Sequence, residues 1–296
     1  MYNVFRFASV VIPRLPRWFV LFLADLIGLV TWLVASKARK QATANIIHVR
    51  GTKVLATRAG PRRLRRTVQQ MFQNNVRNYM DVFSLPHIQP ETILRRMKID
   101  GIEHLDEALA LGKGAILFSA HFGPFDYIVQ GSLAKGYQIT IPVEQLKDQR
   151  MLDLMLKLRR SQGINFLSLG DSSSMRSIIQ ALRKNQVVLV AADRAVQGES
   201  VEKPFFASTA RLPLGPVLLA QRTGAPLVGG FGWYTSNTSM QVQFAPLSLE
   251  LTEQERADTD TLMCGLIELM ERFIKAHPEQ WLMFSPVWIT DLSKTS

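Results

Sequence analysis

The chain is poor in the residues that build the most easily recognised sites. Its 296 residues include one cysteine and five scattered histidines, which excludes a disulfide framework, a cysteine-built zinc site and an HExxH metal motif. A GxSxG motif is absent, and the GKG at residues 112–114 lacks the spacing of a phosphate-binding P-loop. Neither a serine hydrolase nor a P-loop enzyme is indicated, and we expect no bound metal or cofactor. Cys264 falls in an amphipathic helical pattern and is expected in the core.

Acidic residues are missing from the segment at residues 37–66, while the whole chain carries a net charge of +11. Such a segment can bind anionic lipid head groups or a nucleic-acid backbone, or it can be a solvated helix face. Because no nucleic-acid motif accompanies it and an apolar segment precedes it, we expect an anionic membrane surface and no nucleic-acid partner. The basic residues are Lys37, Arg39, Lys40, Arg50, Lys53, Arg58, Arg62, Arg63, Arg65 and Arg66.

One long apolar segment, Trp18–Ser36, contains a single charged residue, Asp25. As a helix it is about 28 Å long, close to the thickness of a bilayer core. It can therefore span a membrane, or lie partly embedded, because a central Asp costs about 2.5–3.5 kcal/mol on insertion. A cleaved signal peptide is a third alternative, although the positive charge that follows resists translocation. The same charge predicts that the rest of the chain stays on the cytoplasmic side.

Strand and helix patterns alternate after residue 100, following an amphipathic helix at Arg62–Phe83 and a mixed stretch at Leu85–Asp100. The alternation predicts an α/β fold, with one domain whose mostly parallel central sheet is flanked by helices, plus the N-terminal hydrophobic helix. We divide the chain into an anchor at 1–36, a basic helical membrane-proximal segment at 37–100 and the main domain at 101–296, with 37–296 as one folded unit. Predicted strands are Ala115–Phe118, Tyr137–Val143, Ile164–Leu167, Val187–Ala191, Pro226–Phe231 and Met240–Phe244; predicted helices are Ile102–Leu111, Met151–Gln162, Ser174–Lys184, Pro216–Arg222 and Thr259–His277.

The stretch GAILFSAHFGPFD, residues 114–126, places a histidine and a carboxylate on either side of a sharp turn. The apolar run predicts a buried strand, and Pro124 is typical of a helix start. His121 then follows the strand, and Asp126 lies in the first helical turn, where the helix dipole favours negative charge. A histidine oriented by a carboxylate can deprotonate a hydroxyl that attacks an ester or thioester. A polar pair that merely caps the helix is the other interpretation.

Four more polar residues stand at the ends of predicted elements. Glu144 follows a strand directly, Arg159 ends a helix, and Asp193 and Arg194 follow the apolar run of residues 187–192. Strand ends are where α/β sheets present ligand-binding loops. Each residue is a candidate for the site, with an ordinary surface or ion-pair role as the alternative.

These residues carry a resemblance to a known family. HFGPFD resembles the HxxxxD/E motif of the lysophospholipid acyltransferase superfamily, in particular its lipid A biosynthesis acyltransferase branch, which includes the phosphatidylinositol mannoside acyltransferases. Three later segments are similar to family blocks in the same order: VEQLKDQRMLDLMLKLRRSQG, AADRAVQGESVEKPFFASTARLPLGPVLLAQRTGAPLV and HPEQWLMFSPVW. The resemblance covers essentially the whole chain and implies a glycerolipid acyltransferase-like fold.

The resemblance also implies an activity. It makes His121 the general base on an acceptor hydroxyl and Asp126 the residue that orients it, while Glu144, Arg159, Asp193 and Arg194 bind substrate or support the site. The acyl donor is then acyl-CoA or acyl-carrier protein, and the acceptor a glycolipid or lysophospholipid at the cytoplasmic face of the bacterial inner membrane. Backbone N–H groups near Gly123, or a basic side chain, are candidate donors to the oxyanion.

Two other functions stay open from the sequence. One is a non-catalytic membrane-binding homologue, and the other is a thioesterase or hydrolase that uses the same His–Asp pair with water as acceptor. The intact motif favours transfer over both. Acceptor, acyl chain length, type of donor and oligomeric state are not decided by the sequence.

Overall fold

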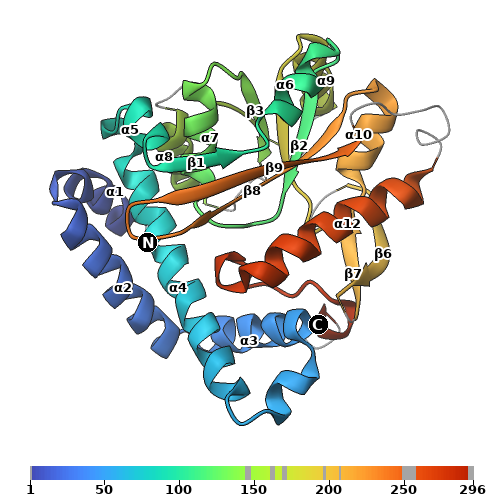
Figure 1. Cartoon of the computed structure of the whole chain (residues 1–296). Helices are drawn as coiled ribbons and strands as arrows, with labels where there is room; N and C mark the ends of the chain where they lie inside the picture. The colour runs from blue at the N-terminus through green and yellow to red at the C-terminus, as the bar shows by residue number, and fades with distance from the viewer. Residues whose placement is uncertain are drawn as a thin grey trace.

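A seven-stranded sheet forms the centre of the computed structural model, which describes residues 2–143, 148–160, 164–168, 172–195, 198–206, 208–248 and 258–292. The strand order is β1-β9-β8-β2-β5-β3-β4 (Figure 1). Neighbouring strands run parallel except β8 and β9, which are antiparallel, so the predicted mostly parallel sheet is confirmed. The strands are β1 (Met97–Asp100), β2 (Ala115–Ser119), β3 (Ile139–Val143), β4 (Asn165–Ser168), β5 (Val187–Ala191), β8 (Leu227–Tyr234) and β9 (Met240–Ser248).

Helices cover both faces of the sheet, as the apolar strands require. Every residue of β2 is buried, and successive side chains point to opposite faces. Ile116 and Phe118 pack in one core with α9, α10 and α12, whereas Ala115 and Leu117 pack in a second core with α6 and α7. These helices are α6 (Glu103–Ala110), α7 (Phe125–Ala134), α9 (Ser172–Arg183), α10 (Gly215–Thr223) and α12 (Thr259–Ala276).

The N-terminal part is a group of helices against one side of the domain (Figure 1). The apolar helix α2 packs along α4 through its face of buried residues, which includes Ala24 and Trp32. Gly28 is required at this contact, because a Cβ there would lie 2.5 Å from Gln73 Cα. The helices are α1 (Tyr2–Val11), α2 (Arg17–Val34), α3 (Ser36–Arg50) and α4 (Gly60–Ser84).

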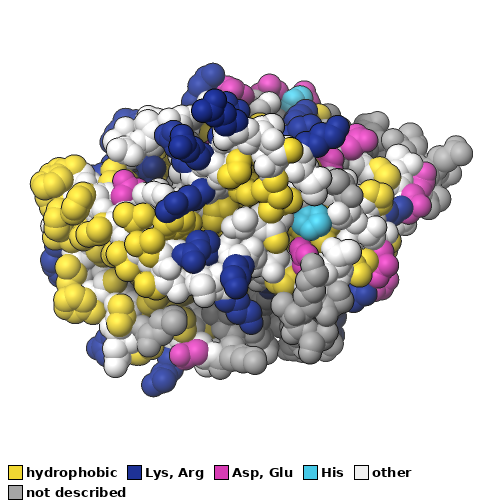
Figure 2. Space-filling model, turned by 90° about the horizontal axis from the view of Figure 1, so that it is seen from below, with side chains coloured by type: hydrophobic (Ala, Val, Ile, Leu, Met, Phe, Trp, Pro, Cys, Tyr) yellow, Lys and Arg dark blue, Asp and Glu magenta, His cyan; other side chains and the backbone are white. Residues whose placement is uncertain are grey.

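The outer face of α2 is apolar and exposed, with Trp18 71% and Val34 72% accessible. Figure 2 shows hydrophobic side chains gathered at one side of the molecule, with Lys and Arg side chains beside them. By length and composition α2 could cross a membrane. Both of its ends, however, contact the same domain. Arg17 is ion-paired with Asp81 of α4, and the Trp32 ring lies 4.9 Å from the Arg65 guanidinium.

Three features differ from the sequence-based expectation. The mixed stretch contains the edge strand β1, and a separate antiparallel hairpin is formed by β6 (Ser200–Phe205) and β7 (Ser208–Pro213). Cys264 is exposed, because it lies on the outward side of α12. The other helices of the described residues are η1 (Ile12–Arg14), η2 (Thr52–Ala56), η3 (Leu85–His87), α5 (Pro90–Leu94), α8 (Gln149–Arg160), η4 (Pro278–Gln280) and α13 (Ile289–Leu292).

Candidate active site

His121 and Asp193 meet at one edge of the sheet because they follow neighbouring parallel strands. Ser119 of β2 lies opposite Ala191 of β5, and each site residue comes two positions later. His121 Nδ1 lies 2.7 Å from Asp193 Oδ1, and the His121 backbone N–H donates to Asp193 Oδ2 over 3.0 Å. The strand register therefore joins an imidazole and a carboxylate that are distant in the sequence.

Asp193 is completely buried, at 0% exposure, and accepts a further hydrogen bond from Trp281 Nε1 over 2.8 Å. Burial alone would raise the pKa of Asp193, but the facing His121 imidazole and the Trp281 and His121 N–H donors outweigh it and lower the pKa. An ionised carboxylate at Nδ1 favours the tautomer with its proton there, which leaves the lone pair on Nε2. The His121 side chain is 49% exposed. The ring can therefore meet a substrate while its partner stays out of water.

Asp126 has a different partner from the one that the sequence predicted. It lies in the first turn of α7 as expected, but its Oδ1 and Oδ2 accept from Arg159 Nε (2.7 Å) and Nη2 (3.1 Å). Burial would lower the pKa of Arg159, and the Asp126 charge outweighs this and raises it. The guanidinium fork occupies both carboxylate oxygens and remains charged at all working pH values. The carboxylate that orients His121 is therefore Asp193, and Asp126 joins α7 to α8.

The C-terminal segment holds the loop that carries His121. Leu282 N–H donates to the His121 carbonyl over 2.8 Å, and Gly123 N–H donates to the Gln280 carbonyl over 2.8 Å. Gly123 has a φ of +59°, and a Cβ there would lie 1.9 Å from Gly232 O. Only glycine fits this position. Its N–H, a candidate oxyanion donor by sequence, is already bound to the Gln280 carbonyl.

The remaining predicted residues are only partly accounted for. Arg194 follows Asp193 and donates from Nη1 to Ser285 Oγ over 3.1 Å. Glu144 lies outside the described residues.

An apolar cavity of about 20 Å³ lies between β2 and α7, lined by Leu117, Val129 and Gly230 among others. This volume holds about one water molecule, so an acyl chain does not fit in the cavity as it stands.

Sequence reasoning missed two contributors, Trp281 and Asn78. The Trp281 indole is a donor to Asp193, and the Asn78 amide donates to the Gly123 carbonyl over 2.6 Å. Trp281 stood in a segment identified only by resemblance. Asn78 gave no signal, because its partner is a backbone carbonyl. No group of three or more His, Cys, Asp or Glu side chains that could hold a metal ion occurs within the described ranges.

The model of the bacterial lipid A biosynthesis acyltransferase family matches residues 4–290. The chain belongs to this family. It is 28% identical over 284 residues to the phosphatidylinositol mannoside acyltransferase of Mycobacterium tuberculosis (strain ATCC 25618 / H37Rv), covering 89% of this chain and 88% of that relative. It is 24% identical over 275 residues to the phosphatidylinositol mannoside acyltransferase of Mycolicibacterium smegmatis (strain ATCC 700084 / mc(2)155), covering 87% and 89%.

These matches confirm the resemblance seen in the sequence motifs. They make the chain an acyl-transferring enzyme of lipid and glycolipid biosynthesis. In this acyltransferase, the half-exposed His121 ring is paired with the buried Asp193 carboxylate.

Proposed function

We propose that this acyltransferase moves a fatty acyl group from an acyl-CoA or acyl-carrier-protein thioester to a hydroxyl of a glycolipid or lysophospholipid. The glycolipid would be similar to lipid A or to a phosphatidylinositol mannoside, the latter named for both relatives above. The observation that carries the proposal is the buried Asp193 carboxylate against a half-exposed His121 ring. A base held in one tautomer and facing outward suits a hydroxyl acceptor.

The proposed reaction uses His121 as its general base. Its Nε2 takes the acceptor's hydroxyl proton as the oxygen attacks the thioester carbonyl carbon. The tetrahedral intermediate collapses, the carbon–sulfur bond breaks, and the imidazolium returns the proton to the leaving thiolate. The ester and the free thiol are the products. Asp193 stabilises the imidazolium between the two proton transfers, and it remains ionised because its pKa is lowered.

Asp126 and Arg159 take a supporting role in this mechanism. Their bidentate pair connects α7, which starts just after the His121 loop, to the end of α8. We propose that the pair supports the part of the site that receives the acceptor, and that Glu144 and Arg194 are further acceptor contacts.

Membrane attachment is part of the proposal, and we favour an in-plane helix over a spanning one. A spanning helix places its ends on opposite sides of the bilayer, whereas Arg17 and Trp32, near the two ends of α2, both contact α4. The exposed apolar face of α2 would enter one leaflet, and the basic segment would bind anionic head groups. The surface would be the cytoplasmic face of the bacterial inner membrane.

Replacing His121 by Ala tests the mechanism. Purified full-length protein is incubated with radiolabelled palmitoyl-CoA and phosphatidylinositol mannoside in anionic vesicles, and both labelled lipid and free fatty acid are measured. We expect labelled lipid from the wild type and a loss of about 10³-fold or more in the folded variant. Undiminished transfer would refute the role of His121. Fatty acid without labelled lipid would favour a thioesterase, and neither product, with palmitoyl-acyl-carrier protein also inactive, would favour a non-catalytic homologue.

A further inference from the structure

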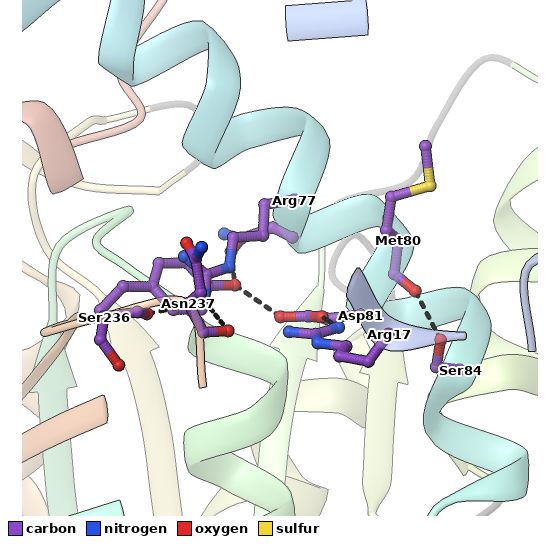
Figure 3. Close-up of polar contacts among 9 residues, drawn as sticks. Arg17, Arg77, Met80, Asp81, Ser84, Ser236 and Asn237 are labelled. Atoms are coloured by element: carbon purple, nitrogen blue, oxygen red, sulfur yellow. Dashed lines mark hydrogen bonds and ion pairs between the residues drawn. The ribbon is translucent and has the colours of Figure 1, made fainter. Parts of the chain in front are cut away.

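A buried polar network lies between the apolar helix α2 and the loop that carries His121. Its centre is Asp81 of α4, whose side chain is 2% exposed and ion-paired with Arg17, the first residue of α2. A buried carboxylate is costly without a partner, so this ion pair fixes where α2 begins relative to α4. Figure 3 shows Arg17 and Asp81 side by side, and Arg77, one turn earlier on α4, beside Ser236 and Asn237, whose carbonyls accept from its Nη2.

Tyr234, the last residue of β8, joins Asp81 to Asn78. Its hydroxyl lies 2.6 Å from Asp81 Oδ2 and 2.8 Å from Asn78 Oδ1, so its one proton is shared between two acceptors. Burial, and then the Asp81 charge, raises the pKa of Tyr234 well above its usual value, which keeps the phenol protonated. Arg77 lies over the Tyr234 ring at 3.6 Å. The Tyr234 side chain is therefore held both at its hydroxyl and at its ring face.

Asn78 completes the connection to the site. Its Nδ2 donates to the Gly123 carbonyl over 2.6 Å, and this carbonyl belongs to the residue two positions after His121. The N–H of the same residue is held by Gln280. Both polar groups of the Gly123 backbone are thus bound: the N–H to the C-terminal segment, and the carbonyl to Asn78 of α4 and to the Phe125 N–H, which donates over 2.9 Å.

We propose that Asn78 is a positioning residue for acyl transfer. Through the Arg17–Asp81 ion pair, the effect of Asn78 depends on how α2 packs against α4. The chain of contacts runs from Arg17 through Asp81, Tyr234 and Asn78 to the Gly123 carbonyl. A membrane surface that receives the apolar face of α2 then also orders the His121 loop. Only the kinetic test of this proposal depends on the proposed function.

The kinetic test compares Asn78→Ala with a matched control, Asn74→Ala. Asn74 lies one turn earlier on α4 and donates from Nδ2 to the Glu279 carbonyl over 2.9 Å, so each change deletes an amide-to-carbonyl bond. Asn78→Ala also removes one acceptor of the Tyr234 hydroxyl, which keeps Asp81 as its other acceptor. In the vesicle assay with palmitoyl-CoA, we expect Asn78→Ala to lower kcat about tenfold with KM within about twofold. Asn74→Ala should leave kcat within about twofold. Equal losses in kcat for the two variants would overturn the positioning role.

A second measurement does not depend on turnover. Hydrogen–deuterium exchange of the peptide spanning residues 117–127 is recorded for full-length protein, with and without phosphatidylglycerol vesicles. We expect vesicles to slow exchange in the wild type and in Asn74→Ala, but not in Arg17→Met or Asn78→Ala. Arg17→Lys keeps a positive charge beside Asp81 and should retain the response. An unchanged vesicle response in Arg17→Met would overturn the coupling. A wild type that responds in exchange but transfers no acyl group would instead refute the proposed function alone.

Should Arg17→Met fail to fold because Asp81 loses its partner, the double variant Arg17→Met/Asp81→Leu removes both charges together. Replacing a buried ion pair by apolar residues is often neutral for stability. The double variant should fold, and its 117–127 peptide should no longer respond to vesicles. A response as large as that of the wild type would overturn the coupling here too.

Discussion

Two aspartates stand near the same loop, and they differ in the kind of cation that each one faces. Asp126 faces a guanidinium that is always charged, through a bidentate contact of 2.7 and 3.1 Å. Asp193 faces an imidazole, which is neutral or charged near neutral pH, at 2.7 Å. A guanidinium keeps its charge, whereas an imidazole can take up a proton. Only the attraction between His121 and Asp193 therefore changes with protonation. The first is a fixed brace, and the second is suited to acid–base chemistry.

Replacing each aspartate by Asn is the most direct way to break this comparison. Asp193→Asn removes the charge that stabilises the imidazolium and allows the wrong tautomer, so we expect transfer to fall on the order of 10³-fold. Asp126→Asn keeps His121 paired with Asp193 and should cost about tenfold or less. The measurement is kcat for labelled palmitoyl transfer, with circular dichroism to verify folding. A larger loss for Asp126→Asn would restore the role that the sequence alone predicted for it.

The Arg159 brace is expected to affect stability more than chemistry. Arg159→Met leaves the Asp126 charge mostly buried and without its ion-pair partner, which should lower the free energy of unfolding by about 2–4 kcal/mol. The loss is smaller than for a fully buried pair because the Arg159 side chain is 28% exposed. Arg160→Met is the control, because that neighbour donates to the neutral Phe166 carbonyl. Urea titration gives both values. The double variant Asp126→Asn/Arg159→Met should recover part of the loss, and no recovery would show that the two side chains act independently.

The main strands and helices could be predicted because burial leaves a pattern in the chain. The apolar runs of β2 and β5 and the helical periodicity of α4 fall within a few residues of their predicted limits. The edge strand β1 could not be found in this way, since its four residues, MKID, are only partly buried. Cys264 lies one position from buried Met263, and small errors in helical phase decide which side of a helix a residue occupies.

The site was harder to predict because its central contact depends on strand register. Asp193 was recognised as a strand-end candidate, but its pairing with His121 requires that β2 and β5 be neighbours in parallel register. Asp126, five residues from His121, was the natural partner by sequence distance. The ion pair that Asp126 forms with Arg159 instead depends on how α8 packs against α7, which no local sequence pattern encodes. Asn78 and Trp281 act on a backbone carbonyl and a distant carboxylate, so they leave no local motif either.

The Trp281 indole allows a finer test of the Asp193 side of the comparison. Trp281→Phe deletes one donor to Asp193 while keeping an aromatic ring, and we expect kcat to fall about tenfold. Trp288→Phe is a matched control, because Trp288 is equally buried and its Nε1 donates to the Phe205 carbonyl over 2.8 Å. Both variants should lose similar stability in thermal unfolding. If Trp288→Phe lowers kcat as much as Trp281→Phe, the loss comes from packing and not from the donor to Asp193.

The smallest expected effect is the pH dependence of stability that Asp193 contributes. Its pKa in the folded protein is lowered from the ordinary value of 3.8, so the unfolded chain binds its proton more readily than the folded one. The contribution is therefore complete above about pH 5 and is lost as pH falls below about 4 toward the folded-state pKa. Urea titrations of wild type and Asp193→Asn at intervals from pH 7 to pH 3 measure it. Below about pH 5 the stability difference should narrow as pH falls, whereas a difference that widens over that range would mean that burial outweighs the His121 and Trp281 contacts.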